Sequence, residues 1–144
     1  MYRAVRVCRR PLLIACVGGL AIAGAWSGAA LAGSPYTVAV KVVPGQVLQH
    51  GVSKVTASGN SSNLSRLEVF LNKSAPCKLT AAGDAAVATD FLLVNTTVVH
   101  VYIKTKAFTA ANLGNHFACA YLTSVPPPSP TLLRARASAS YVVN

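Results

Sequence analysis

The sequence predicts an all-β protein, an antiparallel β-sandwich of about seven short strands with one disulfide. Apolar and polar residues alternate with a period of two over most of the chain after residue 33, which is typical of strands that bury one face. Clusters of Gly, Pro, Asn and Ser separate these segments, and none of them has the apolar period of an amphipathic helix. Many short strands without helices between them favour two packed sheets over a parallel α/β sheet.

The first three predicted strands lie in the N-terminal half of this region. They are Tyr36–Val43, Ser53–Ser58 and Arg66–Leu71. In each strand the apolar residues at alternate positions are expected to face the core and the others the solvent, which places Phe70 on the outer side. Pro44-Gly45 ends the first strand, and the turn-forming cluster Gly59–Asn63 separates the second strand from the third.

The remaining predicted strands follow an alanine-rich stretch, Lys78–Asp90, which is expected to form a short helical turn or an irregular crossover. They are Phe91–Val94, Val98–Lys106, His116–Thr123 and Leu132–Val143. In the second of these, the β-branched residues at odd positions are expected inside, which turns Tyr102 outward. In the third, Cys119 and its alternate neighbours are expected inside, which turns Ala118 and Leu122 outward.

The N-terminal segment, residues 1–32, has the three parts of a secretory signal. Four arginines lie before residue 11, an apolar run extends from Pro11 to Trp26, and Ala30-Leu31-Ala32 forms a small-x-small cleavage site. We therefore predict that cleavage after Ala32 leaves one domain, residues 33–144, that works outside the cytoplasm, either secreted or at the cell envelope.

Three alternatives to simple cleavage stay open. The segment from Pro11 to Ala32 has 22 residues and is long enough to span a bilayer, so an uncleaved segment would anchor the domain, and this is the only membrane contact that the sequence suggests. Leu13-Ile14-Ala15-Cys16 resembles a bacterial lipobox, which would make Cys16 a lipidated N-terminus. Arg9-Arg10 leaves the twin-arginine export route undecided.

Two cysteines follow the signal, Cys77 and Cys119. An even pair in a small exported domain predicts one disulfide. Closing a loop between residues 42 positions apart stabilises a fold by about 4 kcal/mol in the chain-entropy model. Because no C-x-x-C motif or Cys/His cluster accompanies the pair, we predict no metal site.

The segment Gly114–Leu122 resembles the penultimate strand of an immunoglobulin-like (Ig-like) domain, with the aromatic Phe117 two residues before Cys119. Residues 33–144 as a whole resemble the small exported Ig-like sandwich domains of bacterial envelope proteins. Two features depart from that pattern: Phe117 lacks the hydroxyl of a tyrosine corner, and Cys77 follows the third strand instead of lying in the second. These departures exclude an antibody-type core and leave an Ig-like sandwich with its own disulfide.

The sequence offers few residues for catalysis, so we expect no enzyme and no cofactor. Glu68 is expected to face solvent, and the other two acids, Asp84 and Asp90, lie in the least regular part of the chain, which disfavours a paired-acid mechanism. No G-x-S-x-G nucleophile motif and no glycine-rich phosphate loop is present. The three histidines lie on separate segments and are expected to be exposed.

A lysine-rich surface is the first candidate binding face. If the strands take the Ig-like order, the first, second and fifth share a sheet whose outer side carries Lys41, Lys54, Tyr102, Lys104 and Lys106. The formal net charge of the chain falls from +10 to +6 without the four arginines of the signal. We expect this face to contact an anionic envelope polymer or glycan; the alternative is that the lysines only keep the sheet soluble and its edges unpaired.

An apolar surface on the opposite sheet is the second candidate. Its expected outward residues are Phe70, Ala118, Leu122, Arg134 and Arg136. Apolar patches of this kind mark partner surfaces, so we expect this face to dock a protein partner or a second copy of the chain. The alternative is that Lys78–Asp90, held by the disulfide, folds across this sheet and covers it.

These observations predict a secreted or cell-envelope module with a binding or structural role and no catalytic activity. Its expected partner is an anionic cell-wall polymer or a protein, and no specific nucleic acid. The alternative from another functional class is a small secreted effector or inhibitor that engages a protein target through a loop such as Ser124–Pro130. An enzyme acting on esters or glycosides is the third alternative.

Overall fold

The structure, a computed structural model, describes residues 34–73, 75–125 and 131–144. This part of the chain forms six β-strands and one short helix. They are β1 (Tyr36–Val43), β2 (Gln46–Val47), β3 (Val52–Lys73), α1 (Ala81–Ala85), β4 (Phe91–Thr109), β5 (Gly114–Ser124) and β6 (Leu133–Val143). The predicted all-β class is confirmed, while the expected signal, residues 1–32, lies outside the described residues. No helix in the described ranges is long and apolar enough to cross a membrane.

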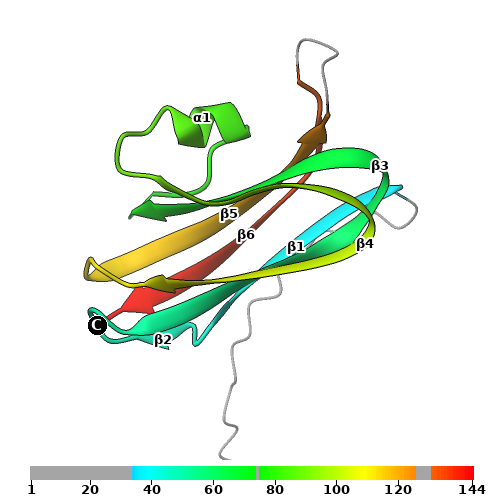
Figure 1. Cartoon of the computed structure of the whole chain (residues 1–144). Helices are drawn as coiled ribbons and strands as arrows, with labels where there is room; N and C mark the ends of the chain where they lie inside the picture. The colour runs from blue at the N-terminus through cyan, green and yellow to red at the C-terminus, as the bar shows by residue number, and fades with distance from the viewer. Residues whose placement is uncertain (1–33, 74, 126–130) are drawn as a thin grey trace, which may run out of the picture.

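The strands form one strongly curved sheet that almost closes into a barrel (Figure 1). Along the sheet the order is β1-β3-β5-β6-β2, and β4 pairs with β3 outside this path. Neighbouring strands are antiparallel except for the short β2, which runs parallel to the end of β6. The curvature comes from β3 and β4, which are the longest strands and bend together.

β3 belongs to two layers because it bends near its middle. Before the bend, residues up to Ser61 pair with β1 and with the second half of β4. After it, residues from Ser65 onward pair with β5 and with the first half of β4. We call β1, the first half of β3 and the second half of β4 the first layer, and the rest of the sheet the second layer. β1 packs across β5 and β6 without pairing with either, so the core lies between the layers.

Polar side chains hold the bend of β3. The hydroxyls of Ser61 and Ser65 form a hydrogen bond of 2.5 Å, and Arg134 Nη1 donates to the carbonyl oxygen of Leu64 at 3.0 Å. The Arg134 guanidinium also lies 4.5 Å from the ring centroid of Tyr36. The sequence predicts a turn between two strands at this point, whereas the polar cluster bends a strand that continues. The predicted strands Phe91–Val94 and Val98–Lys106 are likewise continuous in β4, whereas the short β2 was not predicted. The described residues therefore form six strands where about seven are expected.

The core between the layers is built from alternate residues of the strands, as the period of two predicts. Its buried apolar side chains include Val42, Val55, Ala57, Leu67, Val69, Leu71, Val98, Leu122 and Tyr141. On β1 and β3 these are residues that the sequence predicts to be inside. On β4 and β5, by contrast, the predicted orientation is wrong.

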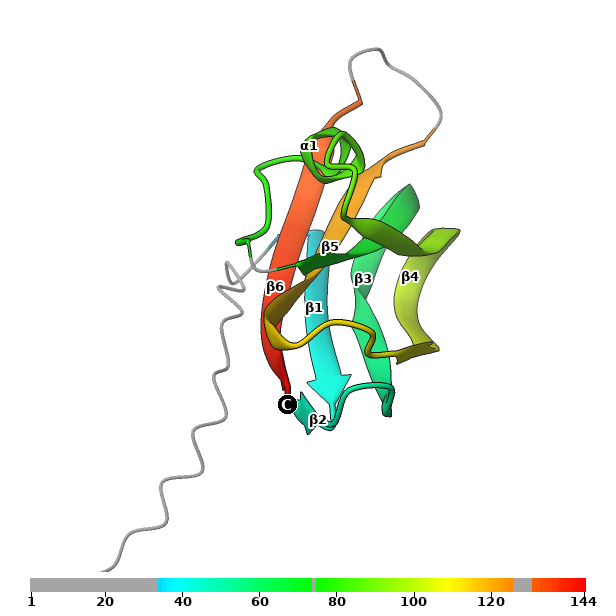
Figure 2. The ribbon, with the colours of Figure 1, turned by 90° about the vertical axis from the view of Figure 1, so that its left-hand side faces the viewer.

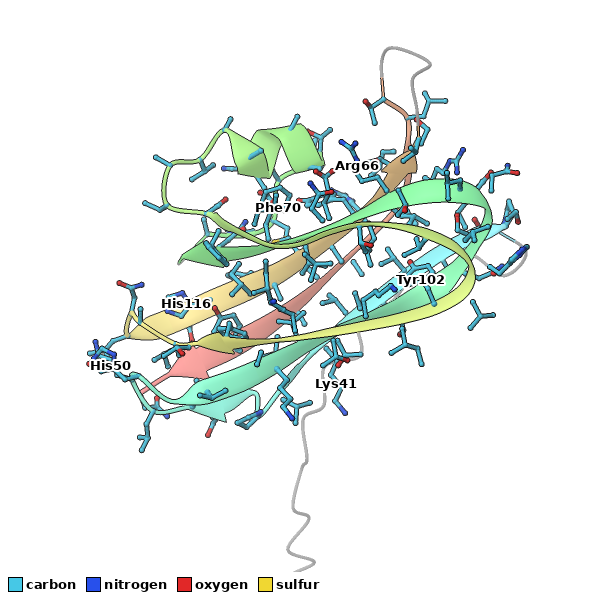
Figure 3. All side chains as sticks on the ribbon, viewed as in Figure 1. Lys41, His50, Arg66, Phe70, Tyr102 and His116 are labelled. Atoms are coloured by element: carbon cyan, nitrogen blue, oxygen red, sulfur yellow. A yellow bond between two sulfur atoms is a disulfide. The ribbon has the colours of Figure 1, made fainter. Side chains whose placement is uncertain are left out.

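In β4 it is Tyr102 that points into the core, whereas Val101 is 81% and Ile103 is 70% exposed. Tyr102 lies opposite Gly59 in β3 and donates a hydrogen bond of 2.8 Å to the carbonyl oxygen of Thr37 in β1. A Cβ atom at Gly59 would come within 2.0 Å of that oxygen and 2.8 Å of the Tyr102 hydroxyl. The absence of a side chain at Gly59 therefore makes room for the ring, and Figure 3 shows Tyr102 between the layers.

In β5 both faces are apolar and both are buried. Ala118 and Leu122 face the core, whereas Cys119 and Tyr121 lie on the outer face of the second layer. There they pack with Phe70 under the crossover that carries α1 (Figure 3). Phe70, Ala118 and Leu122 are therefore buried, and the expectation that they form an exposed partner face is wrong.

The crossover between β3 and β4 is held against this outer face by a disulfide and a buried carboxylate. Cys77 is bonded to Cys119 with their Cα atoms 5.6 Å apart, which confirms the predicted pair. The fully buried Asp84 accepts hydrogen bonds from Tyr121 Oη, Asn72 Nδ2 and the Lys78 amide, at 2.6, 3.1 and 2.9 Å. Because a buried charge without donors is costly, these bonds determine where the crossover sits.

Removing the disulfide is expected to loosen the crossover and destabilise the fold. A Cys77→Ala variant should lose about 4 kcal/mol of unfolding free energy, because its denatured chain is no longer closed over 42 residues. Urea unfolding of the variant and the oxidised parent measures the difference. Free alkylation of both thiols in the native parent protein would contradict the assignment.

The Asp84 carboxylate should be far more important for stability than an acid on the surface. We expect Asp84→Ala to cost about 3 kcal/mol of unfolding free energy, because it leaves the buried Asn72 amide and the partly buried Lys78 N–H without their acceptor. The Tyr121 hydroxyl keeps one acceptor in this variant, the carbonyl oxygen of Lys78 at 2.7 Å. Glu68→Ala is the matched control and should cost less than about 1 kcal/mol. Equal losses in the two variants, measured by chemical unfolding, would show that the buried network does not stabilise the fold.

Three buried tyrosines should make the fold sensitive to alkali. Burial raises the pKa of Tyr102 and Tyr141 from 10.0 to about 12, and burial together with the hydrogen bond to Asp84 raises the pKa of Tyr121 further still. The unfolded chain releases these protons first, so the stabilisation is complete below about pH 10 and is lost as the pH rises towards 12. Tyr102→Phe should flatten this decline in urea unfolding measured across the alkaline range; an unchanged slope would contradict the assignment.

Candidate functional site

The lysines of the expected binding face lie in the first layer but do not share one surface. Lys41 and Lys54 are exposed on its outer face, the side away from the core, where Figure 3 shows Lys41. Lys104 and Lys106 are opposite the inward-facing Ala57 and Val55, so they point to the inner side of the layer at its edge. Tyr102 is buried and therefore does not belong to the exposed face.

The first layer carries positive charge without any acid. Its strand segments, residues 36–43, 52–61 and 100–109, contain all four of these lysines and no Asp or Glu. Exposed apolar side chains accompany the lysines on the outer face, among them Val43, Val101 and Ile103. The three acids of the described chain belong to the second layer or to the crossover. The layer is therefore a basic and partly apolar surface.

The arginines of the expected partner face have different positions. Arg134 turns toward the bend of β3, where it donates to backbone carbonyls and covers the Tyr36 ring, so it does not form part of an exposed patch. Arg136 is exposed and lies beside Tyr121 in the second layer. With Phe70 buried under Ala81, the second layer offers no continuous apolar face among the residues that the structure describes. The crossover covers it, which is the alternative that the sequence left open.

A cleft opens between the layers where β4 begins and ends. Its volume is about 600 Å³, and its walls come from the ends of β3, β4 and β6 and the start of β5. The apolar part of the wall includes Leu71, Phe91, Leu93, Phe108 and Val143. β4 has only β3 beside it at this edge, as Figure 2 shows, so no other described strand closes the gap.

Two stacked rings form the polar part of the cleft wall. His116 is 3% exposed, and its ring stacks on that of Tyr141 with centroids 5.3 Å apart. The ring of Phe108 meets Tyr141 edge to face, also at 5.3 Å. His116 Nε2 is 2.7 Å from the carbonyl oxygen of Asn112, and this oxygen can only accept, so Nε2 carries the hydrogen.

The cleft also contains the hydroxyl of Tyr141 and two charged side chains. The hydroxyl of Tyr141 has no hydrogen-bond partner among the described residues and is not fully buried, so it is open to the cleft. Burial raises its pKa to about 12, so the hydroxyl keeps its proton and can donate at neutral pH. Lys106 and Asp90 also line the cleft and bring opposite charges to it.

The sequence did not indicate this cleft. His116 was expected to be exposed, and that expectation is wrong, whereas His50 and His100 are exposed as expected. His116 and Tyr141 lie far apart in the sequence and meet only because β5 and β6 pair with these two residues opposite each other. The only features of the sequence that could have indicated the cleft were His116 at the start of one predicted strand and Tyr141 near the end of the next. In the described ranges, no group of three or more His, Cys, Asp or Glu side chains is placed to hold a metal ion.

No protein-family model and no curated protein matches the chain. Among solved structures, the chain is similar to the CARDB domain of the PF1109 protein from Pyrococcus furiosus, described in complex with di-metal ions. The match has a TM-score of 0.46 and 16% sequence identity, and it covers 75% of this chain and 91% of that one. The likeness is a general one between β-rich folds.

Proposed function

We propose that this chain is an extracytoplasmic, non-catalytic binding module of the Ig-like sandwich type, and that its first layer contacts an anionic polymer of the cell envelope. The Ig-like assignment is supported by the two facing layers of antiparallel strands with apolar side chains between them. The disulfide between Cys77 and Cys119 supports a location outside the cytoplasm, because such bonds persist in oxidising compartments.

The observation that carries the proposal is the segregation of charge. Lys41, Lys54, Lys104 and Lys106 belong to one layer, and the strands of that layer hold no acid to neutralise them. A positive surface of this kind attracts an extended polyanion over a distance of about one Debye length, which is about 8 Å at physiological salt. An envelope polymer that repeats its charge along the chain could meet Lys41 and Lys54 together on the outer face, while Lys104 and Lys106 add positive charge at the edge of the layer.

The exposed apolar residues of the same layer favour a partner that is not purely ionic. Val101 and Ile103 are two of the most exposed large apolar side chains that the structure describes, and they lie on the same outer side as Lys41 and Lys54. A polymer with sugar or acyl groups between its charges would cover apolar surface and pair with the lysines together. Contacts of these two kinds favour binding without requiring any catalytic group.

Removing most of the charge from the first layer should weaken salt-sensitive binding to isolated cell walls. A variant carrying Lys41→Gln, Lys54→Gln and Lys104→Gln should bind about tenfold more weakly at low salt, because three exposed charge pairs contribute about 0.5 kcal/mol each. Co-sedimentation of the secreted protein with walls at rising salt concentration measures both the affinity and its salt dependence.

The matched control removes the same charge from elsewhere. Arg66, Lys78 and Arg136 are exposed and belong to the second layer or the crossover, so their replacement with glutamine should leave wall binding close to that of the parent. Equal losses in the two triple variants would mean that net charge alone matters, and this result would overturn the proposal. Binding by the parent that does not respond to salt would overturn it as well.

A further inference from the structure

We propose that the cleft between the layers binds a small, neutral, flat aromatic molecule that carries one hydroxyl group, of the phenol or aryl-alcohol class. This site is distinct from the basic outer face of the first layer. It rests on the shape of the cleft and on two polar groups that the fold leaves unused.

The size and lining of the cleft suit a small apolar ligand. Its volume of about 600 Å³ lies within the range of about 300–1,000 Å³ that small-molecule sites occupy. Leu71, Leu93 and Val143 supply aliphatic surface, and Phe108 supplies an aromatic wall. Phe91 also lines the cleft while remaining 61% exposed, so a ligand could bury apolar surface that the folded chain leaves in water.

The aromatic side chains of the wall favour a flat ligand. Phe108 and His116 both contact the ring of Tyr141, one edge to face and one stacked, with both centroid distances at 5.3 Å. These contacts hold the three rings in fixed orientations before any ligand arrives. A further ring could extend the same offset or edge-to-face packing, which adds about 0.5–1.5 kcal/mol per pair to the burial of its area.

Two polar atoms at the cleft can bond a partner that both donates and accepts. Because His116 Nε2 gives its hydrogen to Asn112, a neutral ring leaves the lone pair on Nδ1, and this atom has no hydrogen-bond partner among the described residues. The Tyr141 hydroxyl likewise has no hydrogen bond to another described residue, and it is not among the fully buried atoms, so a ligand in the cleft can reach it. A ligand hydroxyl can donate to the first atom and accept from the second.

The charges at the cleft favour a neutral molecule. Lys106 and Asp90 both line it, and their opposite signs leave little net charge to select an ionic ligand. A carboxylate on the ligand would be attracted by the first and repelled by the second, so the hydroxyl of a neutral molecule fits the set of polar groups best.

The test compares two probes of the same shape on the folded, disulfide-bonded protein. We expect 2-naphthol to bind, and 2-methylnaphthalene, in which a methyl group replaces the hydroxyl, to bind about tenfold more weakly. Titration calorimetry gives the affinities, and methyl chemical shifts of Leu71, Leu93 and Val143 locate the bound probe. No binding of either probe, or shifts confined to residues outside the cleft, would overturn the proposal.

A pair of matched variants tests the role of the hydroxyl. Tyr141→Phe removes one buried oxygen from the cleft and should lower the affinity for 2-naphthol about tenfold while leaving 2-methylnaphthalene unchanged. Tyr102→Phe removes the hydroxyl of a tyrosine that is buried to a similar extent and bonds Thr37 outside the cleft, and it should change neither affinity. If Tyr141→Phe binds both probes as the parent does, the assignment of a polar contact to Tyr141 is wrong.

Discussion

The bend of β3 is the constraint on which the rest of this structure depends. One strand pairs with β1 before the bend and with β5 after it, so the two layers face each other only if the strand turns between Ser61 and Ser65. The hydroxyls of these serines donate to the carbonyl oxygen of Asn63, and the guanidinium of Arg134 donates to that of Leu64, where ladder pairing is interrupted. β4 pairs with β3 on both sides of the bend and bends with it. β4 is therefore the edge strand of both layers on one side of the molecule.

The two sides of the molecule differ because of this arrangement. On the outer face of the second layer, the crossover is fastened by the Cys77–Cys119 bond and by Asp84, and it buries Phe70 and Tyr121. The outer face of the first layer has no such cover in the described chain, and its lysines and apolar residues remain in contact with solvent. At the edge formed by β4 the layers separate, which leaves the cleft beside Tyr141. The exposure of the basic face and the position of the cleft thus both follow from the arrangement of the strands.

Much of the fold could be predicted from the sequence, while most of the site could not. The alternation in Tyr36–Val43 predicted a strand, and the even pair of cysteines in a small exported domain predicted a disulfide; both are present. Alternation does not say which side is inside when both sides are apolar, and a shift of one residue reverses every side chain. Tyr102 is inside because Gly59 leaves room opposite it, and Leu122 is inside because the crossover covers the other side of β5. Neither reason is visible within the strand concerned.

The sequence by itself determined that this chain forms strands, where the lysines lie along them and which cysteines are available to pair, because these are properties of short segments. Only the tertiary structure decided which faces are buried, that the crossover covers the second layer, and that His116 stacks on Tyr141. These outcomes depend on contacts between residues that are distant in the sequence. Each outcome depends on the volume, charge and hydrogen bonds of a residue that is adjacent in space, and the local sequence pattern does not identify that residue.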